Sequence, residues 1–109
     1  RDFIYVKDAA EMTLWLADNK RVVGVFNCGS GQANDWNRLI GAIFAALGRQ
    51  PDIVYVPMPE HLRGKYQYHT EAQMDKLRAA GYTRPLTELE DAVADYVQNH
   101  LVPGRHLGA

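Results

Sequence analysis

The stretch VVGVFNCGSG, residues 22–31, decides the fold. Its first six residues are almost continuously apolar and rich in valine, which is typical of a strand covered on both faces. The glycine-bearing turn that follows would lead into a helix capped by Asp35 and ended by Gly48. Five apolar residues recur there at helical spacing: Trp36, Leu39, Ile40, Ile43 and Leu47.

Two further short runs predict strands on either side of this unit, namely FIYV at residues 3–6 and IVYV at residues 53–56. A helix is predicted after the first run, where Asp8 and Glu11 have capping-box spacing. Two more helices are predicted near the C-terminus, one from Thr70 to Gly81 and one opened by Pro85. The order β-α-β-α-β-α-α favours an α/β fold with parallel pairing where a helix separates two strands.

Composition restricts the class of protein. The 109 residues, 47% of them hydrophobic, suffice for one small globular domain. A net charge of -1 argues against nucleic acid as a partner, and no apolar run approaches the roughly 18 residues of a membrane span. A single cysteine, Cys28, cannot form an internal disulfide, which favours the cytoplasm, and we expect its thiol to be buried and structural. The chain also begins within a predicted strand, which suggests a fragment.

Few residues have the spacing of a functional site. The four histidines, at positions 61, 69, 100 and 106, form no metal-binding pattern, so no metal is expected. The turn formed by Gly29, Ser30 and Gly31 is half of a phosphate-binding motif, but the simpler interpretation is a tight turn that requires positive φ.

The segment RGKYQY, residues 63–68, has the chemistry of an anion-binding loop, because it combines two cations and two tyrosines before a helix. The alternative is a solvated loop whose tyrosines pack on the sheet, and the residues alone do not decide between them. Arg1 is similarly either a bidentate anion clamp or a surface charge, and its spacing alone favours the surface charge.

Several motifs resemble a known family. RDFIYVKD at residues 1–8 and FNCGSG at residues 26–31 are similar to signatures of extended short-chain dehydrogenases that act on nucleotide sugars. PMP at 57–59, LRGKYQ at 62–67, TEA at 70–72 and LRAAGY at 77–82 more narrowly resemble the ADP-glycero-manno-heptose 6-epimerase family. The resemblance runs from Arg1 to about residue 100, and it departs from the family pattern at Cys28 and His69.

The resemblance implies the C-terminal part of an extended short-chain dehydrogenase, with the last strands on the Rossmann side and a small mixed α/β substrate-binding domain. Residues 1–102 would form this portion and residues 103–109 a tail. By the same resemblance, Arg1 and Tyr66 would bind the nucleotide sugar near its diphosphate, and Arg63 and Lys65 would add positive charge nearby.

The implied reaction inverts C6 of the heptose in ADP-heptose for the lipopolysaccharide inner core. A tightly held NADP would take a hydride from C6 and return it to the opposite face, aided by a Tyr-x-x-x-Lys pair. These 109 residues contain neither that pair nor the glycine-rich cofactor loop, so we expect no catalysis from them alone. The implied partners are the N-terminal Rossmann part of the same enzyme and further copies in a homo-oligomer.

Two alternatives stay open at this point. One is another extended short-chain epimerase or dehydratase with a different nucleotide sugar. The other is a non-catalytic module that binds nucleotides or RNA through Arg63, Lys65, Tyr66 and Tyr68. The near-neutral net charge weighs against RNA.

Overall fold

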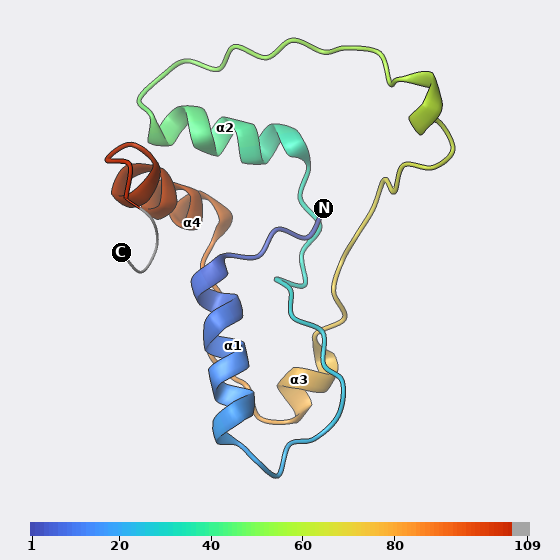
Figure 1. The fold of residues 1–109 in the computed structure, drawn as a ribbon, viewed down its shortest axis with the longest axis vertical. Coiled ribbons are helices and arrows are strands. Elements are labelled where there is room, and N and C mark those ends of the chain that lie inside the picture. Colours follow the sequence, from blue (N-terminus) through green and yellow to red (C-terminus); the bar gives the residue numbers. More distant parts are fainter. Residues whose placement is uncertain (106–109) are drawn as a thin grey trace.

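The computed structural model describes residues 1–105, and these residues form helices joined by long irregular segments (Figure 1). The α-helices are α1 (Val6–Asp18), α2 (Trp36–Ala46), α3 (Asp75–Ala79) and α4 (Leu89–Tyr96), with a short 3-10 helix η1 (Glu60–Leu62). The π-helical turn η2 (Val97–Leu101) continues α4. Within residues 1–105 there is no β-strand, only an isolated antiparallel bridge between Asp2 and Ala33.

The predicted strands at residues 3–6, 22–27 and 53–56 are therefore not confirmed. A strand is stable only where a neighbouring strand accepts and donates its backbone hydrogen bonds. Figure 1 shows these three segments in different parts of the molecule, so they cannot pair with one another. In the second and third segments several apolar side chains are uncovered, with Val25 87% and Val54 82% exposed. The predicted α/β fold therefore has no sheet within residues 1–105.

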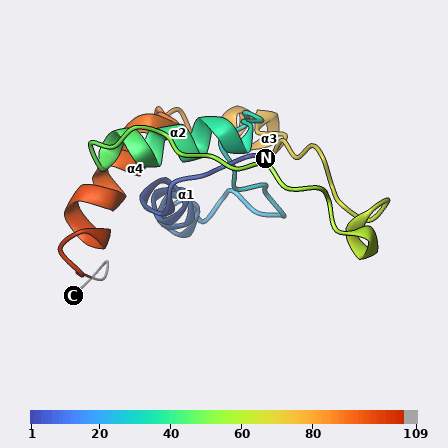
Figure 2. The same ribbon diagram turned by 90° about the horizontal axis from the view of Figure 1, so that it is seen from above.

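The molecule is flat and open. Its extents are 49 × 39 × 21 Å, and Figure 2 shows α2, α3 and α4 at one level, α1 below them, and η1 projecting to one side. The radius of gyration is 16.7 Å, whereas a compact chain of this length has about 13 Å. The accessible surface is 8126 Å², against about 6,100 Å² for a typical folded monomer of this mass. Much of the apolar surface is thus left uncovered by this chain.

Two groups of packed side chains hold the helices together. In the first, α1 packs on α3 and the turn after it, where Met12, Leu77 and Tyr82 are each 1% exposed. Trp15 of α1 lies edge-on to Tyr82, with ring centroids 5.5 Å apart. In the second, α2 packs against α4 and η2 and buries Ala42, Leu89, Ala92 and Val97.

The ends of α2 agree with the sequence prediction. The Asp35 carboxylate accepts a hydrogen bond from Arg38 N at 2.7 Å, as an N-cap should. At the other end, Gly48 has a φ of +66°, the left-handed conformation that ends many helices. Gly81 ends α3 in a similar way, with a φ of +110°. These signals are local, which is why the sequence sufficed to find them.

Other predicted helix ends were wrong. Helix α1 begins at Val6, and Asp8 does not cap it; its carboxylate accepts hydrogen bonds from Thr87 N and Oγ1, at 2.8 and 2.9 Å. The third helix covers only Asp75–Ala79, because Thr70 accepts a hydrogen bond from Asp2 N instead of opening a helix. The fourth begins at Leu89 rather than near Pro85. Residues 106–109 of the predicted tail lie outside the described residues, so the boundary at residue 102 stays a prediction.

Candidate functional site

The two residues assigned to the substrate lie together at one cavity of about 390 Å³. Three segments of chain form it: the first residue, the start of α2 beside it (Figure 1), and the loop that follows η1. Its lining includes Arg1, Asn34, Trp36, Tyr66, Tyr68 and His69. Arg1 and Tyr66 are 65 positions apart in the sequence, so their meeting is a result of the fold.

Arg1 and Tyr66 form a cation–π pair, with the guanidinium carbon 5.2 Å from the ring centroid. Arg1 Nη1 also donates a hydrogen bond to Gln67 Oε1 at 3.2 Å. Since a guanidinium has five N–H donors, the Gln67 contact leaves capacity to bind an anion bidentately.

Tyr66 is held by Trp36 at the N-terminus of α2. The indole Nε1 donates to the Tyr66 hydroxyl oxygen at 3.0 Å. Trp36 is itself placed by Phe3, whose ring lies edge-on at 5.1 Å between centroids. The Asp35 carboxylate, also in the wall of the cavity, caps α2 by accepting a hydrogen bond from Arg38 N.

Asp2 links the first residues of the chain to the glycine turn at residues 29–31. Its carboxylate accepts hydrogen bonds from Ser30 N at 2.7 Å, Ser30 Oγ at 2.6 Å, Gly31 N at 2.9 Å and Ala72 N at 2.9 Å. Asp2 N in turn donates to Thr70 Oγ1 at 3.1 Å. One residue thus joins the first segment, the turn at residues 29–31 and the segment that follows the loop bearing Tyr66.

This arrangement decides between the two interpretations of the glycine turn. The N–H groups of Ser30 and Gly31 do face an anion, but the anion is the carboxylate of Asp2. Gly31 has a φ of +72°, which confirms the tight-turn interpretation for that glycine. Since its donors are already used, the turn does not fit the phosphates of a dinucleotide, and we derive no cofactor contact from it.

The hydrogen bonds determine the charge state of Asp2. Partial burial by itself would raise its pKa, but the donors on Ser30, Ala72 and Gly31 outweigh burial and lower the pKa below its ordinary value of 3.8. A lowered folded-state pKa stabilises the protein above the ordinary pKa, and the stabilisation is lost as the pH falls through the folded value.

We therefore expect a pH-dependent difference between the wild type and Asp2→Asn, both made as the full-length protein that carries this chain. The difference in free energy of unfolding should be constant from pH 7 to about 5 and shrink below about pH 4. Denaturant titrations at several pH values would measure it. A difference that stays constant down to pH 3 would contradict this account of Asp2.

Other candidates for chemistry have simpler roles. The prediction of a buried Cys28 was wrong, since the residue is exposed, although its Sγ lies 3.6 Å from Met12 Sδ. The residue is exposed as a whole, but partial burial of its sulfur beside Met12 and the nearby charge of Asp2 raise the Cys28 pKa, which opposes a thiolate nucleophile. Within residues 1–105 no three His, Cys, Asp or Glu side chains are grouped to hold a metal ion, and His106 lies outside this range.

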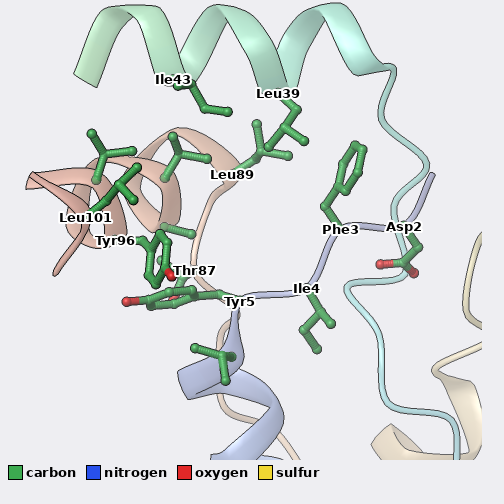
Figure 3. Close-up of a pocket in the computed structure, with 14 residues that line it drawn as sticks. Asp2, Phe3, Ile4, Tyr5, Leu39, Ile43, Thr87, Leu89, Tyr96 and Leu101 are labelled. Carbon is green, nitrogen blue, oxygen red and sulfur yellow. The ribbon is translucent and has the colours of Figure 1, made fainter. Parts of the chain in front are cut away.

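A larger cavity, of about 760 Å³, lies between residues 2–6, α2 and α4 (Figure 3). Its labelled side chains are mostly apolar, among them Phe3, Leu39, Ile43 and Leu89. Among residues 1–105, no lysine or arginine lines it. This cavity is therefore an apolar groove, and Arg1 lies at the smaller cavity.

No protein-family profile matches the chain. A curated ADP-L-glycero-D-manno-heptose-6-epimerase from Nitratidesulfovibrio vulgaris strain DP4 is 57% identical over 101 residues, which is 93% of this chain and 31% of that protein. The epimerase of the same name from the Hildenborough strain is 56% identical with the same coverage. The one from Alkalilimnicola ehrlichii is 40% identical over 89% of this chain and 30% of that protein.

By sequence, the chain is a homologue of proteins named ADP-L-glycero-D-manno-heptose-6-epimerase. It spans less than a third of the length of the three relatives and matches their C-terminal part. Among residues 1–105, none of the helices combines the length and apolar character that crossing a lipid bilayer requires.

The structure also shows what the sequence interpretation of this epimerase homologue missed. Arg63 is paired with Glu60 at 3.2 Å, and neither Arg63 nor Lys65 lines the cavity. Trp36 was interpreted only as part of an apolar helix face, yet it is 49% exposed and contacts Tyr66. Asp2 falls in the motif RDFIYVKD, which by itself gives this residue no role. No short-range pattern signals either contact, because their partners lie at least 28 positions away.

Proposed function

We propose that this chain is the substrate-binding part of an enzyme that inverts C6 of the heptose in ADP-glycero-manno-heptose, a step in lipopolysaccharide inner-core synthesis. The observation that carries the proposal is the 57% identity to an ADP-L-glycero-D-manno-heptose-6-epimerase over 93% of the chain. NADP as the cofactor and a cytoplasmic location belong to the same proposal.

The role we assign to these residues is to hold the diphosphate of the nucleotide sugar. Arg1 supplies a fixed positive charge with free N–H donors, and Tyr66 supplies a hydroxyl beside it. Gln67 accepts a hydrogen bond from Arg1, and Trp36, in the wall of the same cavity, donates one to Tyr66. The redox chemistry at C6 needs a cofactor site that the glycine turn does not offer, so we assign to this chain binding and not hydride transfer.

The partner of this surface, in our proposal, is the Rossmann part of the same enzyme. The relatives are about three times as long as this chain, and the exposed segments at residues 22–27 and 53–56 have the composition of sheet strands. A neighbouring sheet would supply the missing backbone partners and would cover the apolar groove of Figure 3. A homo-oligomer of the complete enzyme is a further part of the proposal.

We expect Arg1→Ala to weaken the binding of ADP-heptose by about tenfold or more and Tyr66→Phe by about fivefold. The first change removes a charged donor and the second a neutral one. Both should be measured in the full-length protein by calorimetry, together with the rate of epimerisation. Unfolding curves equal to that of the wild type would show that the fold is intact.

Two matched variants control for the loss of an arginine or a tyrosine hydroxyl. Arg63→Ala removes a cation that pairs with Glu60 away from the cavity, and Tyr55→Phe removes an exposed hydroxyl outside it. Neither should change the affinity. Equal affinities in all four variants would overturn the site. Tighter binding of UDP- or GDP-sugars would indicate another nucleotide-sugar enzyme, and a steep loss of RNA binding with salt would indicate a nucleic-acid module.

A further inference from the structure

Trp36 touches the candidate site in a way that its place on an apolar helix face does not explain. About half of the side chain is exposed, so burial is not its main contribution. Its indole N–H points at the hydroxyl oxygen of Tyr66, at 3.0 Å. An indole can only donate a hydrogen bond, so the direction of this bond is fixed: Trp36 donates and Tyr66 accepts.

The direction of that hydrogen bond determines whether the Tyr66 hydroxyl can donate a hydrogen bond to a ligand. A phenolic hydroxyl has one hydrogen to donate and an oxygen that accepts. With the indole hydrogen on the oxygen, the phenolic hydrogen must point elsewhere, and no hydrogen bond within residues 1–105 uses it. The neighbouring cation of Arg1 lies against the ring rather than at the hydroxyl, so it does not compete for that oxygen. The hydroxyl is therefore prepared to donate.

We propose that Trp36 is a positioning residue: it orients the Tyr66 hydroxyl as a hydrogen-bond donor toward a phosphate oxygen of the nucleotide sugar. This inference rests on the proposed function of Tyr66 and adds a residue that the family resemblance did not assign. Phe3 holds the indole edge-on, so the ring is fixed on one side while its N–H is directed into the cavity. A donor oriented before the ligand arrives loses less conformational entropy on binding.

The test is a double-mutant cycle in the full-length protein, with ADP as the probe and calorimetry as the measurement. Trp36→Phe keeps an aromatic ring against Phe3 but removes the N–H donor. It should weaken ADP binding by about threefold to tenfold in the wild-type background. In the Tyr66→Phe background the same change should have almost no effect, because there is no hydroxyl left to orient.

A merely structural role would give a different result. If Trp36 only packs, its loss would weaken binding equally in both backgrounds, and that outcome, or no effect in either, would overturn the inference. The matched control is Trp15→Phe, which changes the other tryptophan, at Tyr82 and away from the cavity, and should leave ADP affinity unchanged. If Tyr66→Phe and Arg1→Ala both bind ADP normally, the proposed binding site at Arg1 and Tyr66 is wrong. If these two variants bind ADP weakly but Trp36→Phe does not, only the positioning role of Trp36 is wrong.

Discussion

Asp2→Ala is expected to lower the free energy of unfolding by about 3 kcal/mol and to weaken nucleotide-sugar binding by more than tenfold. The carboxylate accepts four hydrogen bonds, three of them from backbone N–H groups of Ser30, Gly31 and Ala72. Without it these donors lose their partner, and hydrogen bonds to a charged group are among the strongest. The binding loss follows because Asp2 adjoins Arg1 and holds the segment that follows Tyr66. Chemical denaturation and calorimetry of the full-length protein would measure both effects.

Two variants separate this role from a loss of negative charge. Asp2→Asn keeps one carbonyl oxygen and should retain part of the stability, whereas Asp18→Ala removes an exposed carboxylate at the end of α1 and should have an effect within about 0.5 kcal/mol. If Asp2→Ala were as mild as Asp18→Ala, the hydrogen bonds to Asp2 would not determine the structure of the site.

Gly29→Ala is expected to destabilise the protein by about 2 to 3 kcal/mol. The reason is space and not backbone conformation, because Gly29 does not have a positive φ. A Cβ at this position would lie 2.4 Å from the Cβ of Ala72 and 2.9 Å from Asp2 Oδ2. Either the turn or the segment at Ala72 must move, and both carry donors to Asp2. Thermal and chemical unfolding of the full-length protein would measure the change.

The close approach also suggests a rescue. Ala72→Gly removes the nearer of the two clashing atoms, so the double variant Gly29→Ala/Ala72→Gly should recover part of the lost stability. Gly41→Ala is the matched control, since a Cβ there meets nothing within 4 Å and alanine favours a helix. No recovery in the double variant, with Gly41→Ala neutral or stabilising, would show that the contact with Ala72 is not the cause.

The sequence predicted those parts of the fold that depend on near neighbours. The cap at Asp35 and the ends at Gly48 and Gly81 each involve residues within one or two turns of helix. The sheet could not be verified in the same way, because a strand such as residues 22–27 exists only when another strand pairs with it. Asp8 shows the same limit on a smaller scale, since its carboxylate binds Thr87 rather than its own helix.

For the candidate site, the residues alone favoured a surface charge at Arg1 and left the loop at residues 63–68 undecided, and the family resemblance selected Arg1 and Tyr66. The structure brings these two together, with the guanidinium over the ring. Their role in binding substrate stays a prediction. Trp36 and Asp2 could not be assigned from the sequence, because apolar spacing and a strand-like motif already accounted for them and their contacts depend on the folded arrangement.

The exposed segments at residues 22–27 and 53–56 make this chain prone to aggregation in a cell. Both are rich in β-branched residues and neither contains a charged side chain. Exposed segments of this composition can pair as strands with a second chain in register, which is how amyloid-like deposits begin. As long as nothing covers them, these two segments are the natural targets for a chaperone. Aggregation of this chain would be expected to begin at these same residues.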